Sequence, residues 1–178
     1  MNKITVIESG DLRHCISVRQ KEIAEITPTR VTQGATLDNN KEQYGAANAV
    51  DKDLSTKSGA QASWLKLELG KIHQVHMIRI YYTFYTNWYD PKRDDWCTKN
   101  VGNFKACVNS HNNVDVSVYQ GEVKQKSCGT LQLTYGLEQS DQIYTLICNT
   151  EGDTVKLSKT TEWISVFEVA VIRTGSYN

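Results

Sequence analysis

The chain has 178 residues, enough for one domain that buries a substantial core. Its formal net charge is zero, with 22% charged and 39% hydrophobic residues, which is an ordinary globular balance. A chain without net positive charge offers no basic field to a phosphate backbone, so nucleic acid is excluded as the expected partner. No apolar run approaches the roughly 20 residues that cross a bilayer.

The first 30 residues have no regular pattern. Charged and aliphatic side chains are mixed there in no clear period, and Pro28 ends any regular element that precedes it. We expect residues 1–30 to form an N-terminal extension or an extra strand, and residues 31–178 to form the main domain. The N-terminus lacks the extended hydrophobic region of a signal peptide, so a secreted protein would have lost its signal from this chain.

From residue 31 onward the pattern is that of β-structure. Short runs rich in Val, Ile, Thr and Tyr are separated by glycine and polar clusters. Strands are expected at 75–82, 114–119, 142–148, 154–158 and 164–171. No stretch shows a sustained helical stripe. Alternation at period two predicts that one side of each strand faces the core; these inward residues are Leu65, Leu67, Leu69, Ile78, Ile80, Val114, Val116 and Val118. The sequence therefore predicts an all-β fold, a single jelly-roll β-sandwich.

A long polar loop, 86–107, is the expected ligand-binding face, since loops of this length inside a compact domain are usually functional or disordered. Aromatic rings can stack on a sugar while charged groups bond its hydroxyls. The same side chains also suit a protein interface or a membrane interface, and the tryptophans can instead pack a small core within the loop. The candidate ligand-binding residues are Trp88, Tyr89, Arg93, Asp94, Asp95 and Trp96.

Five cysteines suggest disulfides and an oxidising, extracellular compartment. Cys128 and Cys148 lie in strand-like segments that one sheet can bring within bonding distance. Cys97 and Cys107 bracket the polar loop, and a bridge between them can close it. Cys15 is then left over, free or paired with another chain, so a disulfide-linked homo-oligomer is one alternative. Some of these residues can instead be buried thiols.

Oxygen-bearing side chains gather between residues 51 and 58, and a lone carboxylate interrupts the last strand. Hard cations such as Ca²⁺ bind several oxygens, and a buried Glu168 would need a partner. We therefore predict one calcium ion enclosed by Asp51, Glu168 and the backbone carbonyls around Asn48, Asp53 and Phe167. The alternative is an Asp-rich turn and a solvent-facing glutamate.

Two separated segments resemble the discoidin (coagulation factor V/VIII C-type) and F-type lectin families. The run 48–53, Asn-Ala-Val-Asp-Lys-Asp, is similar to their calcium loop, although Lys52 stands where they have glycine. The run 166–171 is similar to their closing strand, and 64–71 with 75–81 to their core. The resemblance covers about 31–173 and implies a galactose-binding-domain-like sandwich. It also implies structural calcium held by Asn48, Asp51, Asp53, Ser58 and Glu168.

The resemblance does not extend to fucose. Fucose-binding members use a histidine and two arginines, and the second arginine begins an Arg-Gly-Asp-like motif. Here no histidine lies between Asp51 and Trp64, and the loop has Lys92-Arg93-Asp94-Asp95 in place of that motif. We expect a secreted or cell-surface, non-catalytic module that binds a glycan or glycoprotein on a cell surface. The alternative is an adhesion or recognition domain that binds protein or anionic lipid through the 86–107 loop. No nucleophile elbow, zinc-protease motif or phosphate loop is present to suggest an enzyme.

Overall fold

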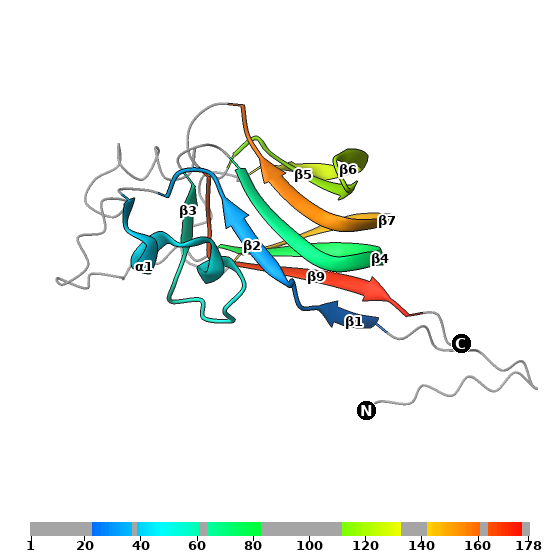
Figure 1. Ribbon diagram of the computed structural model, residues 1–178, viewed down its shortest axis with the longest axis horizontal. Coiled ribbons are helices and arrows are strands. Elements are labelled where there is room, and N and C mark those ends of the chain that lie inside the picture. Colours follow the sequence, from blue (N-terminus) through cyan, green and yellow to red (C-terminus); the bar gives the residue numbers. More distant parts are fainter. Residues whose placement is uncertain are drawn as a thin grey trace, which may run out of the picture.

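The computed structural model describes residues 23–36, 39–60, 64–82, 112–132, 142–160 and 164–175. These residues form a sandwich of antiparallel strands accompanied by two short helices (Figure 1), so the predicted all-β class is confirmed. The elements in chain order are β1 (Ile23–Ile26), β2 (Arg30–Gln33), α1 (Lys41–Tyr44), η2 (Ala46–Ala49), β3 (Ser58–Ala60), β4 (Trp64–Tyr82), β5 (Val114–Gln120), β6 (Val123–Leu131), β7 (Gln142–Ser158), β8 (Ile164–Val166) and β9 (Glu168–Thr174).

One large sheet contains most of the strands. Its order is β1-β9-β4-β7-β5-β6, and β2 also pairs with β4. A second, small sheet consists of β3 and β8. All the pairings are antiparallel, and the edge strand β1, at 23–26, pairs with β9. Residues 1–30, for which the sequence predicts either an extension or an extra strand, therefore contribute the strand β1 to this sheet.

The two long strands β4 and β7 give the sandwich its shape. They pair along nearly their whole length, with register shifts between Glu68 and His73 and between Val75 and Met77, and both curve strongly in Figure 1. Because bulges bend a strand and increase its twist, one strand pair supplies parts of both layers. The sequence predicts two strands where β7 is one, because its middle, 149–153, contains turn-forming residue types.

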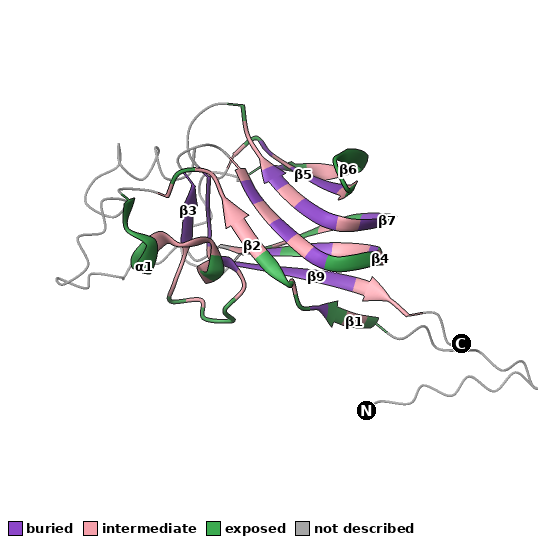
Figure 2. Cartoon of the chain, viewed as in Figure 1, coloured by how far each residue is buried: buried purple, intermediate pink, exposed green. Residues whose placement is uncertain are grey.

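The bulges also change which residues of β4 face inward. Leu65, Leu67 and Leu69 are buried before the second bulge, and Ile78 and Ile80 are buried after it. Odd positions thus give way to even ones, since one extra residue in a strand reverses the side on which its later side chains lie. The inward residues predicted from the sequence are confirmed on both halves, and the two halves share one core cluster. Figure 2 shows the resulting alternation of buried and partly exposed residues along β4 and β7.

A disulfide joins the outer hairpin to the centre of the sheet. Cys128 on β6 and Cys148 on β7 are bonded, with their Cα atoms 4.7 Å apart, which confirms that predicted bridge. Cys148 is fully buried and Cys128 packs against the core. Lys126 donates from its Nζ to the Cys148 carbonyl, 2.5 Å away, so β6 is held against β7 by a covalent and a polar contact at the same place. The predicted Cys97–Cys107 bridge lies outside the described residues.

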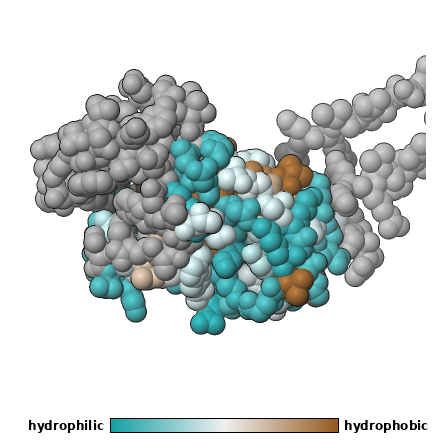
Figure 3. Space-filling model, turned by 90° about the horizontal axis from the view of Figure 1, so that it is seen from above, coloured by the Kyte–Doolittle hydropathy of each residue, from teal (hydrophilic) through white to brown (hydrophobic). Residues whose placement is uncertain are grey.

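The described part of the face seen in Figure 3 is mostly hydrophilic, with small apolar areas. No helix among the described residues is long and apolar enough to span a bilayer. The large apolar side chains that remain exposed are spread over several strands and the β4 bend: Ile23, Ile72, Val123, Ile143 and Ile147.

Replacing both Cys128 and Cys148 by alanine should lower the free energy of unfolding by about 3 kcal/mol, because the bridge closes a loop across 20 positions of sequence. Chemical denaturation of the two proteins without reductant measures the difference. Dithiothreitol should destabilise the wild type by at least this amount and the variant by less, since the variant can lose only the predicted Cys97–Cys107 bridge. Equal stability of the variant and the oxidised wild type would contradict this role for the bridge.

Gly152→Ala should destabilise the fold by about 1–3 kcal/mol, because a new methyl group has no room at the first β4–β7 bulge. An added Cβ there would lie against the Val118 side chain and 2.5 Å from the Tyr119 carbonyl oxygen. Thermal denaturation checks the effect. Gly121→Asn is the control, since that site has open space around it and asparagine tolerates its positive φ of 58°. An unchanged melting temperature for Gly152→Ala would show that β5 can move away.

Candidate metal centre and ligand loop

The loop that precedes β3 is held in shape by its own side chains. Asn48, in η2, donates from its amide nitrogen to the carbonyls of Gln43 at 3.1 Å and Lys57 at 3.2 Å. These bonds tie α1, η2 and the end of the loop together. The loop between them therefore has a fixed entry and a fixed exit, and Ala49 is fully buried beneath it.

The two aspartates of the loop stabilise its turns. Asp51 accepts a hydrogen bond from the backbone N–H of Asp53 at 2.9 Å and another from the Thr56 hydroxyl at 2.7 Å. Asp53 accepts from the N–H of Ser55 at 2.8 Å. These are turns of the kind in which a carboxylate bonds to backbone two residues further on. Both carboxylates are thereby directed and held, and both residues remain exposed to solvent.

Lys52 has the backbone conformation expected of the glycine that the family pattern places here. Its φ is 65°, in the left-handed region that residues with a Cβ adopt at a cost. The conformation points its N–H at Glu168, whose Oε2 accepts it at 3.0 Å. The loop therefore meets the last strand through a backbone donor, and lysine fills the position at the expense of some backbone strain.

Pairing of β3 with β8 brings the end of the loop to the beginning of β9. Ser58 is opposite Val166, and its hydroxyl donates to the Val166 carbonyl at 3.3 Å. Glu168 follows two residues later as the first residue of β9. Segments more than 100 residues apart in sequence thus meet at one point, which is why the loop and the closing strand can contribute to one site.

Glu168 is a buried carboxylate. It is 8% exposed, and among the described residues its hydrogen-bond donor is the N–H of Lys52. Burial above all, with the nearby carboxylates of Asp51 and Glu25, raises the pKa of this carboxyl to about 7, although the N–H and the charge of Lys52 oppose the rise. Two negative groups next to a buried third one form a place where a cation would be stabilised.

The structure brings together part of the predicted ligand set. Asp51 and Glu168 lie close enough to interact electrostatically, and Ser58 joins them through β8. Asn48 directs its amide nitrogen at carbonyls, and Asp53 caps a turn. No group of three or more His, Cys, Asp and Glu side chains gathers as a metal site within the described ranges. A cation here would therefore need backbone or hydroxyl oxygens besides the two carboxylates, as calcium commonly uses.

The sequence pattern did not indicate that Glu25 belongs to this neighbourhood. It reaches the site because β1 pairs with β9, placing Glu25 opposite Ile172. Lys52 Nζ lies 3.9 Å from its Oε1. The unpatterned stretch 1–30 gave no signal for this placement, since a four-residue edge strand is too short to show alternation.

The predicted ligand-binding loop lies outside the described residues. Trp88, Tyr89, Arg93, Asp94, Asp95 and Trp96 all fall in the interval between β4 and β5. Their assignment as ligand-binding residues stays a prediction. The end of β4, which leads into this interval, pairs with β9 beside the candidate metal centre. Tyr81 is opposite Glu168, and its carbonyl accepts from the N–H of Phe167 at 3.3 Å.

No protein-family model matches the sequence, and no curated protein matches it significantly. Solved structures do match. A fucose-binding module from Streptococcus pneumoniae is 19% identical, with a TM-score of 0.58 over 84% of this chain and 95% of that one. The fucolectin of striped bass (Morone saxatilis) serum is 14% identical, with a TM-score of 0.57 over 83% of this chain and 46% of that one.

A truncated AlyQ with a family 32 carbohydrate-binding module and an alginate lyase domain is 18% identical, with a TM-score of 0.53 over 88% of this chain. The chain spans only 35% of that protein and under half of the bass lectin. What these chains share with it is the sandwich itself. The protein therefore has the fold of the discoidin-like galactose-binding domains, the fold found in F-type lectins and family 32 carbohydrate-binding modules.

Proposed function

We propose that this chain is a non-catalytic, extracellular carbohydrate-binding module that recognises a cell-surface glycan. The observation that carries the proposal is the fold, because the similar structures include a lectin and two carbohydrate-binding modules. One of them is described as a fucose-binding module and consists almost entirely of this domain. Since a fold hosts many functions, the ligand must be identified by experiment.

The ligand site in this proposal is the 86–107 loop. Its tryptophans stack on a sugar ring, and Arg93 with the two aspartates bonds the hydroxyl groups, as a small polar ligand requires. Fucose is not the ligand we propose, because no histidine lies between Asp51 and Trp64 and the loop has Lys92-Arg93-Asp94-Asp95 in place of the Arg-Gly-Asp-like motif of the fucose-binding pattern. The disulfide between Cys128 and Cys148 is consistent with an oxidising compartment.

We also propose that one structural calcium ion completes the domain. Asp51 and Glu168 would supply its charged ligands, with Ser58 and the backbone oxygens near Asn48, Asp53 and Phe167 as the remainder. The proposal is supported by the meeting of the loop with β9 and by the burial of Glu168 beside another carboxylate. Calcium would offset the cost of burying that charge and hold the loop against the last strand.

Calcium in excess should raise the melting temperature of the wild type, by an amount that corresponds to about 2.7 kcal/mol at one hundred times its dissociation constant. Glu168→Gln should lose most of this gain, because it removes a charged ligand and keeps an oxygen for the Lys52 N–H. Differential scanning calorimetry with calcium or EDTA measures both. Glu122→Gln, at the exposed β5–β6 turn, should respond to calcium as the wild type does.

The alternative outcomes are clear. If EDTA leaves the wild-type melting temperature unchanged, the protein holds no stabilising calcium. If Glu168→Gln gains as much from calcium as the wild type, the ion binds elsewhere.

Trp96→Ala and Arg93→Ala should each abolish binding on a glycan array while leaving the melting temperature unchanged, because both side chains are proposed to contact the sugar. The array should be run with calcium and again with EDTA. Wild-type binding by both variants would remove the 86–107 loop from the proposal. A blank array with folded wild-type protein would point instead to a protein or lipid partner.

A further inference from the structure

A second surface of the molecule combines positive charge with an aromatic ring. It is the side of the sheet formed by β2, β4, β7, β5 and β6 that lies opposite the side packed on the core. We call it the outer face. Because side chains alternate along strands, it is formed by Arg30, Thr32, Trp64, Lys66, Glu68, Thr154, Lys156, Asp115, Ser117, Tyr119, Lys124 and Ser127. Two of these, Ser117 and Thr154, are buried, and the others are at least partly exposed.

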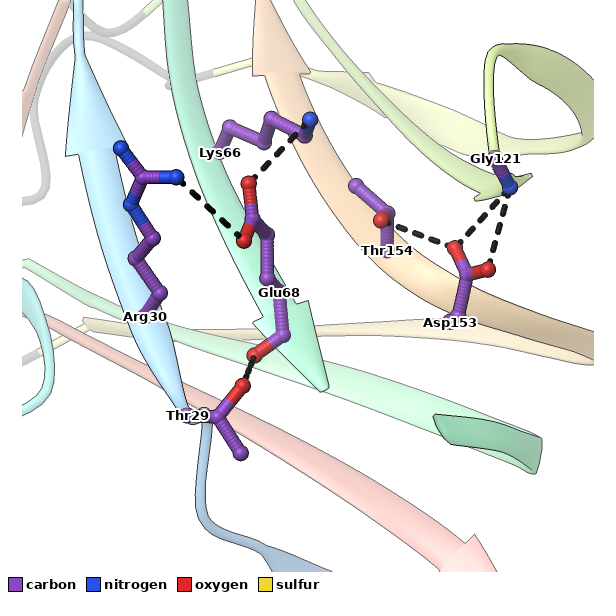
Figure 4. Close-up of polar contacts among 7 residues, drawn as sticks. All are labelled: Thr29, Arg30, Lys66, Glu68, Gly121, Asp153 and Thr154. Carbon is purple, nitrogen blue, oxygen red and sulfur yellow. Dashed lines mark hydrogen bonds and ion pairs between the residues drawn. The ribbon is translucent and has the colours of Figure 1, made fainter. Parts of the chain in front are cut away.

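The carboxylates of the outer face are already engaged by cations. Glu68 lies 3.3 Å from Lys66 Nζ and 3.9 Å from an Arg30 nitrogen, and Figure 4 shows these two side chains converging on it from β4 and β2. Asp115 accepts from Lys124 Nζ at 3.0 Å. Asp153, which accepts from the Thr154 hydroxyl at 2.9 Å, adds a third carboxylate beside the face (Figure 4). Three carboxylates thus stand against four cations, a small excess of positive charge in a chain that has no net charge.

Of the four cations of the outer face, Lys156 is the one for which the described residues provide no counterion. It lies at the centre of the face and directly opposite Lys66 on the neighbouring strand. Like charges directly opposite each other in a sheet are destabilising, and threonine or serine at this position would remove the repulsion. Glu68 offsets the charge of Lys66 in part, at 3.3 Å, so Lys156 is the cation whose charge an external anion would compensate.

Trp64 is next to this pair. It is partly exposed and lies on the same side of β4 as Lys66. Two residues along a strand span about 7 Å, and neighbouring strands are about 4.8 Å apart. The backbone positions that carry the indole and the two ammonium groups are thus spaced at about the size of one sugar ring with its substituent.

We propose that the outer face binds a sulfated polysaccharide, with a sulfate ester between Lys66 and Lys156 and a sugar ring against Trp64. This goes beyond the loop-based function proposed above, since it concerns a different surface. Charge complementarity selects this occupant. A sulfate has three terminal oxygens that two lysines can share, and anions spaced one or a few sugars apart match a modest excess of charge. The much denser phosphates of nucleic acid would need a broader basic field.

A carrageenan-derived tetrasaccharide and its desulfated counterpart, compared by isothermal titration calorimetry in a calcium-containing buffer, test the inference. The wild type should bind the sulfated form only. Lys156→Gln should weaken binding about tenfold or more, because each charge-assisted hydrogen bond contributes strongly. Its melting temperature should stay equal or rise, because the repulsion with Lys66 is gone. A merely structural lysine would show the opposite, namely lower stability and unchanged binding.

Lys41→Gln, which removes an exposed lysine from α1, away from the outer face, is the control and should bind as the wild type does. Equal weakening by Lys41→Gln and Lys156→Gln would reduce the effect to general charge attraction and overturn the proposal. Amide shifts in a ¹⁵N NMR titration should centre on 64–68 and 154–158. Shifts confined to 86–107, or no binding of the sulfated sugar, would overturn the outer-face site and leave the glycan-array test of the loop standing.

Discussion

The bent pairing of β4 with β7 is the constraint on which the other features depend. A single antiparallel pair supplies strands to both layers, and every other strand of the large sheet is positioned by it. The bend needs residues that can leave the regular ladder. Gly70 has a φ of 81°, and a Cβ there would lie 2.6 Å from the Thr29 side chain. Gly152, at the same bulge on β7, has no room for a Cβ. At the second bulge His76 Nδ1 and Asn149 Oδ1 lie 2.5 Å apart, and Asn149 has a positive φ of 48°.

Much of the fold follows from local alternation, because apolar and polar residues alternate in the sequence of a strand that is buried on one side. The inward positions of β4 and β5 and the bridge between Cys128 and Cys148 were predictable for that reason. The continuity of β7 was not, since 149–153 has the composition of a turn and only its pairing with the bent β4 keeps it extended. The break of the last run at Phe167, between β8 and β9, was equally hidden, because both sides are buried and read as one strand.

The candidate metal centre was predictable only in part. A carboxylate within an apolar strand is expensive unless it has a partner, so Glu168 was conspicuous, and its burial is now observed. Its approach to Asp51 could be inferred because two distant segments both matched one family pattern. The third nearby carboxylate, Glu25, could not be inferred, since a long-range edge pairing delivers it. Lys52 illustrates the same limit: its left-handed backbone follows from the loop, while its side chain reaches Glu25 only once β1 is in place.

Net charge and local charge lead to different conclusions about partners. A total of zero argues against a densely charged polyanion, because such partners need a field extending over a whole surface. It does not prevent charges from separating onto different faces. Here Asp51, Glu25 and Glu168 gather where the loop meets β9, while Lys66 and Lys156 face each other on the outer face. Each grouping is offset only in part, by Lys52 at 3.9 Å from Glu25 and by Glu68 at 3.3 Å from Lys66. A cation at the first and an anion at the second would offset the like-charge repulsion that remains, so the two proposals rest on one argument about charge.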